Sequence, residues 1–133
     1  MSILGVESVV FGVGDLAEHT RFWADFGLPL EHADENEAVF RVASGSRVIL
    51  YRHGDPRLPS PDPFPGDGVK ETAWGVIDQA SLDRYAASLA REVPVIRDAD
   101  GTVRCTCPDG QPIALRLWQK RHFVSETSPV NTP

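Results

Sequence analysis

The sequence of 133 residues is poor in several residue types, and each shortage excludes a class of protein. Two cysteines are too few for the disulfide framework of a small secreted domain. Lys and Arg number 13 against 19 Asp and Glu, a net charge of −6, which leaves no basic face for nucleic acid or an anionic membrane. No apolar run approaches the roughly 18 residues of a membrane-spanning helix, and the start has no basic region or cleavage site typical of a signal peptide. We therefore expect a cytoplasmic protein that binds neither nucleic acid nor membrane.

The two cysteines, Cys105 and Cys107, are separated by one residue. In a strand they would share one face with their Cα atoms about 7 Å apart, which is the limit of disulfide reach. A metal site would need a further soft ligand nearby, and the sequence offers none. We expect two buried, reduced thiols.

One pattern of elements occurs twice along the chain. In residues 3–53 a strand leads into a helix that Gly27 ends, and the short runs LPLEH, AVFRV and RVILYR follow. In residues 69–119 the strand TAWGVID leads into a helix opened by Asp78, followed by VPVIR, TVRCTC and PIALRLW. The turns between these runs are too short for crossover helices, so the runs read as hairpins. Residues 54–68 form a connector that contains five prolines.

The sequence therefore predicts one α+β domain, residues 1–119, made of two βαβββ units. Residues 120–133 are polar and read as a tail or an interdomain linker. The helices should bury one apolar face each against the sheet. The positions expected to be buried are Leu16, Phe22, Trp23, Phe26, Leu82, Tyr85 and Leu89.

A glycine pattern at the end of the first strand has the spacing of a dinucleotide-binding turn. Gly12, Gly14 and Ala17 form G-x-G-x-x-A, and acidic Glu37 follows at a suitable distance. The second copy, TAWGVIDQA, lacks the second glycine but keeps the aspartate, and hairpins follow instead of a crossover. Asp15 is better interpreted as the N-cap of the helix, where its carboxylate would repel a pyrophosphate. We therefore exclude NAD binding and expect the glycines to allow a tight strand end beside its neighbours.

The duplicated unit resembles the vicinal oxygen chelate superfamily, which includes glyoxalase I, bleomycin-resistance proteins and extradiol catechol dioxygenases. The resemblance rests on GVESVVFGVGDLAEHTRFWADFGLPL, AWGVIDQASLDRYAASL and CPDGQPIALRLW. It implies curved mixed sheets around a cavity, with the helices on the convex side. Enzymes of this superfamily hold a divalent metal in that cavity, where it chelates two adjacent oxygens of the substrate.

The positions that supply metal ligands in the superfamily correspond here to Ser8, Ile49, Glu71 and Ala114. Of these, only Glu71 is a plausible ligand for a hard cation. The histidines are expected at the surface and not as ligands; they are His19, His32, His53 and His122. The resemblance thus implies no metal in this chain, and Fe(II) or Mn(II) would belong to a second domain outside it.

Strand alternation adds Tyr51, Arg116 and Trp118 to the inward face of the same cavity. The candidate cavity residues are then Ser8, Ile49, Tyr51, Glu71, Ala114, Arg116 and Trp118. They could bind a planar anionic or aromatic ligand. The interpretation we favour is that Arg116 pairs with Glu71 and the aromatic side chains fill the cavity.

Three functions are compatible with these features. The first is the metal-free N-terminal structural domain of an extradiol dioxygenase-type oxidoreductase that acts on an aromatic diol, inactive by itself and partnered by a second homologous domain. The second is a stand-alone homodimer that binds a small aromatic or drug-like molecule, as bleomycin-resistance proteins do. The third, with the least support, is a glyoxalase-like lyase.

Overall fold

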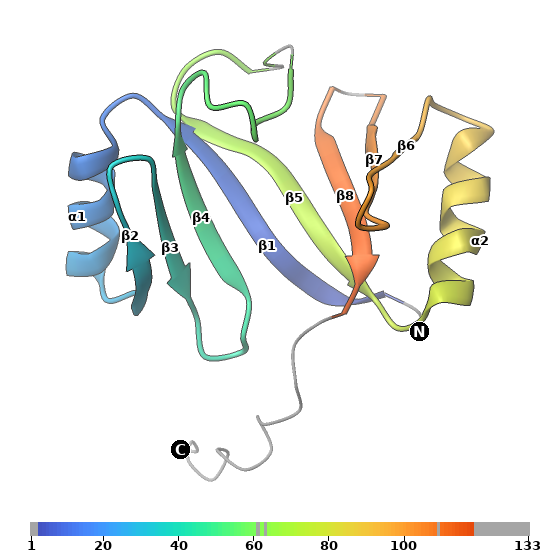
Figure 1. Cartoon of the computed structure of the whole chain (residues 1–133), viewed down its shortest axis with the longest axis horizontal. Helices are drawn as coiled ribbons and strands as arrows, with labels where there is room; N and C mark the ends of the chain where they lie inside the picture. The colour runs from blue at the N-terminus through green and yellow to red at the C-terminus, as the bar shows by residue number, and fades with distance from the viewer. Residues whose placement is uncertain (1–2, 61, 63, 109, 119–133) are drawn as a thin grey trace, which may run out of the picture.

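A computed structural model of the chain describes residues 3–60, 62, 64–108 and 110–118 (Figure 1). The first half contains β1 (Ile3–Val13), α1 (Leu16–Phe26), β2 (Leu30–Ala33), β3 (Glu37–Arg41) and β4 (Arg47–Arg52). The second half contains β5 (Gly68–Val76), α2 (Gln79–Ala90), β6 (Ile96–Arg97), β7 (Val103–Thr106) and β8 (Pro112–Leu117). This is the predicted βαβββ order, twice. The predicted tail, residues 120–133, lies outside the described residues.

All eight strands of the described residues belong to one sheet, in the order β2-β3-β4-β1-β5-β8-β7-β6. β1 and β5 run antiparallel at its centre, and each pairs in parallel with the last strand of its own unit, β4 or β8. The remaining pairs are antiparallel hairpins. The strand order reads the same from either end, as expected for two copies of one unit.

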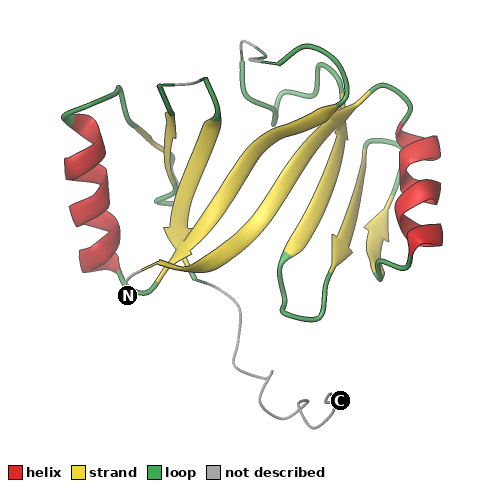
Figure 2. Ribbon diagram, turned by 180° about the vertical axis from the view of Figure 1, so that it is seen from behind, coloured by secondary structure: helices red, strands yellow, loops and turns green. Residues whose placement is uncertain are grey.

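The two helices lie at opposite ends of this sheet (Figure 2). α1 contacts β3 and β4, and α2 contacts β5, β7 and β8. Each helix covers a separate core. The first consists of Val13, Leu16, Ala38, Phe40 and Leu50, and the second of Val76, Leu82, Ala86, Val103 and Leu115. No helix of the described part is long and apolar enough to cross a membrane.

Aspartate side chains begin both helices, as predicted. Asp15 accepts a hydrogen bond from the Glu18 N–H at 3.0 Å, and Asp78 accepts one from the Ser81 N–H at 2.8 Å. Gly27 ends α1 in the left-handed conformation, with φ 115°. These local signals fix where each helix starts relative to the preceding strand.

The predicted buried face of α1 is partly wrong. Leu16 is buried and Trp23 packs against the first core, but Phe22 and Phe26 are 57% and 71% exposed. At about 100° per residue, Trp23 lies roughly 20° round the helix from Leu16, whereas Phe26 and Phe22 lie roughly 80° and 120° away, outside the stripe that faces the sheet. The two phenyl rings stack on each other with their centroids 6.2 Å apart.

On α2 the predicted positions agree better with the structure. Leu82 is buried, and Tyr85 and Leu89 are half-buried against the second core.

Trp23 and Phe26 provide a matched test of this packing. Trp23→Ala removes a half-buried indole from the first core and should lower the free energy of unfolding by about 2–3 kcal/mol. Phe26→Ala removes an exposed ring and should change it by less than about 0.5 kcal/mol. Urea denaturation measures both. Equal losses in the two variants would contradict the assigned orientation of α1.

Candidate functional site

The face of the sheet opposite the helices, here the helix-free face, collects the positions that the resemblance marks as metal-ligating. Ser8 pairs with Ala73, and Ala73 pairs with Ala114, across three neighbouring strands. Val10 lies between Ile49 of β4 and Glu71 of β5. Because directly paired residues point to the same face of a sheet, Ser8, Ile49, Glu71 and Ala114 share the helix-free face.

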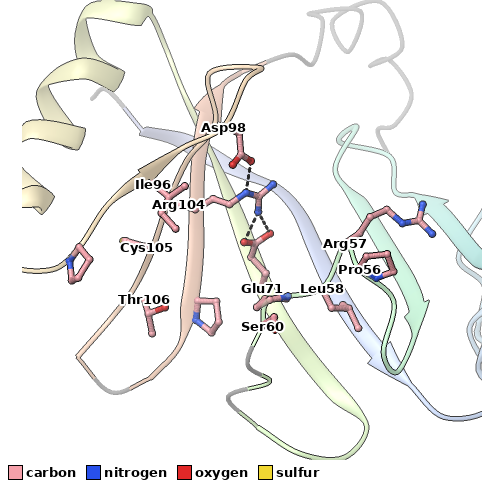
Figure 3. A pocket seen from close by; sticks show the side chains of 13 residues that line it. Pro56, Arg57, Leu58, Ser60, Glu71, Ile96, Asp98, Arg104, Cys105 and Thr106 are labelled. Atoms are coloured by element: carbon pink, nitrogen blue, oxygen red, sulfur yellow. Dashed lines mark hydrogen bonds and ion pairs between the residues drawn. The ribbon is translucent and has the colours of Figure 1, made fainter.

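Glu71 is bound to an arginine that the sequence analysis did not select. Arg104 of β7 donates from Nη1 to both carboxylate oxygens of Glu71, at 2.6 and 2.5 Å, and from Nε to Asp98 at 2.5 Å (Figure 3). Glu71 is 8% exposed. Burial by itself lowers the pKa of Arg104, but the hydrogen bonds that Arg104 donates to Glu71 and Asp98 outweigh this effect and hold its pKa above the ordinary value. We call these three residues the Arg104 cluster.

The expected pairing of Arg116 with Glu71 is therefore wrong. Arg116 pairs with Gly75 at the far end of β8, two residues beyond Ala114. It lines a small cavity of about 160 Å³ together with Asp100 and Gln79. Arg104, by contrast, pairs directly with Ala114, one of the four positions that correspond to metal ligands in the superfamily.

The predicted cavity aromatics lie against protein groups. A Cβ atom at Gly75 would come within 2.0 Å of the Trp118 ring, so the indole covers the backbone of Gly75. Tyr51 lies beneath Arg57, whose Cζ is 4.1 Å from the ring centroid. Burial raises the pKa of the Tyr51 phenol. Both aromatic rings thus cover protein groups on the sheet, but neither lines the cavity of about 580 Å³ that remains open on this face.

The proline-rich connector is held on the helix-free face by Lys70. A register shift between β1 and β5 makes Lys70 an extra residue opposite Val10 and Phe11. Its side chain is buried, and Nζ donates to both carboxylate oxygens of Asp62 at 3.1 Å, to the Gly66 carbonyl at 2.7 Å and to the Phe64 carbonyl. The Lys70 hydrogen bonds hold the pKa of Asp62 below its ordinary value. All of these acceptors belong to the connector.

Gly12 and Gly14 allow the connector and Lys70 to pack against β1, and they do not form a nucleotide-binding turn. A Cβ atom at Gly12 would lie 3.0 Å from Lys70 Cε and 3.2 Å from Leu58 Cδ1. The Gly14 N–H donates to the Asp67 carboxylate at 2.9 Å, so it is not open to a phosphate. The expected close approach at Gly12 is confirmed. Neither glycine has a positive φ, so neither makes a turn that requires glycine.

Asp67 ties the end of the connector to the first unit. Besides the Gly14 N–H, its carboxylate contacts His53 Nε2 at 2.8 Å and His19 Nε2 at 3.2 Å. Contacts with His53, Gly14 and His19 hold the pKa of Asp67 below its ordinary value. The connector is therefore anchored at Lys70 and again at Asp67.

A cavity of about 580 Å³ lies between connector residues 56–60 and the second half of the helix-free face (Figure 3). The Arg104 cluster forms its polar wall. Pro94, Ile96 and Pro112 contribute apolar surface on the same side. Because the connector occupies the first half of the face, the cavity is confined to the second unit.

The four ligand-equivalent residues on the helix-free face do not fit a divalent metal. Ser8 offers a hydroxyl, Ile49 and Ala114 offer no donor atom, and the one carboxylate, Glu71, is already bound to Arg104. A catalytic metal site of this kind needs about three protein ligands. Lys70 is a cation and cannot serve as a ligand while charged.

A separate group of His32, Asp34 and Glu37 lies at the β2–β3 hairpin, with one ligand atom of each within 4.8 Å of the others. His32 is exposed, as predicted, and contacts Asp34 at 3.1 Å and Glu37 at 3.3 Å. His19 and His53 also contact carboxylates, and His122 lies outside the described residues. This hairpin group is distant in the sheet order from the ligand-equivalent positions on β5 and β8.

Both cysteines are free thiols, as predicted. Cys105 is buried in the cavity wall, and burial raises the pKa of its thiol. Cys107 is half-buried, so the expectation of burial is met only at Cys105.

Comparison by sequence finds no matching family model and no matching curated protein. Comparison of structures does find matches. An extradiol ring-cleaving dioxygenase from B. fuscum is similar to this chain with a TM-score of 0.71 and 21% identity, over 90% of this chain and 34% of that one. Homoprotocatechuate 2,3-dioxygenase from Arthrobacter globiformis has the same TM-score and identity, over 90% of this chain and 37% of that one. A 2,3-dioxygenase from a Pseudomonas strain has a TM-score of 0.70 and 20% identity, over 90% of this chain and 42% of that one.

These matches show the fold, as the resemblance implied. The chain spans about a third of the length of the first of these enzymes.

The Lys70 contacts predict a large loss of stability when the ammonium group is removed. Lys70→Met would remove the hydrogen bonds of the ammonium group to the connector and should lower the free energy of unfolding by about 1–3 kcal/mol, the usual contribution of hydrogen bonds to a charged group. Arg91→Met, at an exposed position, removes the same charge and is the control. Urea denaturation and limited proteolysis of residues 53–67 are the measurements. Similar stability in the two variants would show that the connector does not depend on Lys70.

The Asp67 contacts predict a pH-dependent contribution. Since the folded pKa of Asp67 is lowered, its ionised form stabilises the protein above the ordinary aspartate pKa, and this contribution disappears as the pH falls through the lowered value. Asp67→Asn should therefore melt below the wild type at neutral pH and converge with it under acid conditions. Asp25→Asn, on the exposed side of α1, is the control with the same change of charge. A constant difference at every pH would refute the assignment.

Proposed function

We propose that this chain, which has the vicinal oxygen chelate fold of extradiol dioxygenases, is a metal-free domain of a dioxygenase-type oxidoreductase. The observation that carries the proposal is the hydrogen bonding of Glu71 to Arg104 at a position where enzymes of this fold hold a metal ligand. The domain supports the structure of the protein, and ring cleavage takes place elsewhere.

The chemistry of ring cleavage supports this division. Polarising two adjacent oxygens of a substrate requires a cation with open coordination positions. In this chain the only carboxylate among the ligand-equivalent positions is occupied by a guanidinium group. The connector covers the neighbouring half of the same face and is fixed there by Lys70. A metal ion and a catechol could bind on this face only by displacing both the Arg104 guanidinium group and the connector.

The proposed partner is a second domain of the same fold. The extradiol dioxygenases that match are two to three times longer than the matched segment, because that segment covers 34% to 42% of them. In our proposal the second domain holds Fe(II) or Mn(II) and acts on an aromatic diol. In the same proposal the protein is cytoplasmic.

The cavity favours one alternative, a stand-alone homodimer that binds a small aromatic or drug-like molecule. Its volume of about 580 Å³ is within the range of small-molecule sites, and mostly apolar walls with a few polar groups are typical of them. A glyoxalase-like lyase has less support, because it requires the metal ligands that Ser8, Ile49 and Ala114 do not provide.

Metal analysis tests the proposal directly. The purified chain should contain no stoichiometric Fe, Mn, Zn or Ni, and EDTA should leave its melting temperature unchanged, because one engaged carboxylate does not make a site. Elemental analysis by mass spectrometry is the measurement. About one metal per chain, lost in Glu71→Ala, would refute the proposal.

Activity assays separate the alternatives. The chain alone should not cleave catechols, whereas a longer product of the same gene should do so if it contains the second domain. Ring cleavage by residues 1–133 alone would contradict the proposal. A stable dimer that binds an aromatic molecule, with no further domain in the gene, would support the alternative.

A further inference from the structure

We propose that the Arg104 guanidinium is a built-in cation that takes the place of a divalent metal on the helix-free face. This inference rests on the proposed metal-free role of the domain. It goes further than that role, because it assigns Arg104 as the positive charge in place of the metal ion. It also explains why the ligand-equivalent position Ala114 carries no ligand.

The side chain of Arg104 reaches Glu71 across β8. Arg104 pairs with Ala114 of β8, which in turn pairs with Ala73 of β5. Glu71 lies two residues from Ala73 on the same face, so the guanidinium group crosses β8 between the levels of Ala114 and Pro112 to contact it. Ala114 is fully buried and projects only a methyl group. Any larger side chain there, including a metal-ligating carboxylate, would occupy the path of Arg104.

The contacts of Arg104 are those that a metal would make with carboxylates. Nη1 binds both oxygens of Glu71, and Nε binds Asp98 from the turn before β7 (Figure 3). One cation thus bridges two carboxylates, as a divalent ion does. A carboxylate as buried as Glu71 is costly to leave unpaired. A buried carboxylate that stays ionised needs a cation beside it, and Arg104 is the cation that contacts Glu71.

Removal of the guanidinium group should leave Glu71 and Asp98 facing each other with no cation between them. Two converging carboxylates are oxygen ligands of the kind that Mn²⁺ prefers. The prediction is therefore a chemical rescue: Arg104→Ala should be destabilised, and Mn²⁺ should restore part of the lost stability by binding where the guanidinium group was.

The experiment compares melting temperatures of the full chain with and without about 10 mM MnCl₂. Arg104→Ala should melt well below the wild type, and Mn²⁺ should raise its melting temperature by about 3 °C or more. The wild type should not respond. Arg97→Ala, which removes an exposed arginine paired with Asp83 at 3.0 Å, is the matched control and should not respond either. The double variant Arg104→Ala/Glu71→Gln should lose the response.

Each outcome of this experiment either supports or refutes the inference about Arg104. A folded Arg104→Ala variant with no response to Mn²⁺ would overturn the inference while leaving the metal-free role intact. A wild type that binds one metal per chain would overturn the proposed function as well. If Arg104→Ala does not fold alone, recovery of native circular dichroism on refolding in Mn²⁺ supports the inference, and no recovery refutes it. Arg104→Lys keeps a cation and should remain stable without Mn²⁺.

Discussion

The buried ammonium group of Lys70 organises the helix-free face. A charge removed from water must be surrounded by oxygen atoms, and Lys70 obtains them from three places in the connector. A proline-rich segment has few backbone donors of its own and forms no ladder with the sheet. The lysine therefore supplies the attachment that strand pairing would otherwise provide. The position of Leu58 over Gly12, and with it one wall of the cavity, follows from this attachment.

The two halves of the domain have the same arrangement of strands, but different groups cover the helix-free face in each half. In the first half the connector lies on the sheet, and Tyr51 is covered by Arg57. In the second half the face carries the Arg104 cluster and borders the cavity. Both cations on this face come from the second half of the sequence: Lys70 of β5 holds the connector, Arg104 of β7 binds Glu71 and Asp98, and each is satisfied by oxygen atoms of the protein. The duplication thus preserves the backbone, while side chains adapt the halves to separate roles.

The sequence was sufficient for the fold because its strongest signals are local. Asp15 and Asp78 cap the helices through residues three positions away, and hairpins depend on short turns. The Arg104 pair was missed because it depends on contacts across three strands, and alternation along β8 alone favoured Arg116. Placing Arg104 beside Ala114 in the predicted hairpin would have revealed it. The connector was also beyond prediction, since its path depends on the extra residue at Lys70.

The crossing of Ala114 by Arg104 has an evolutionary consequence. Reversion of Ala114 to a glutamate would introduce a side chain into the path of the guanidinium group and a second buried carboxylate beside Glu71. Loss of Arg104 first would leave Glu71 without its partner. Either of these two single substitutions would therefore produce a less stable protein. An arginine in this place therefore opposes the appearance of a metal-ligating pair of carboxylates on this face by one substitution at a time.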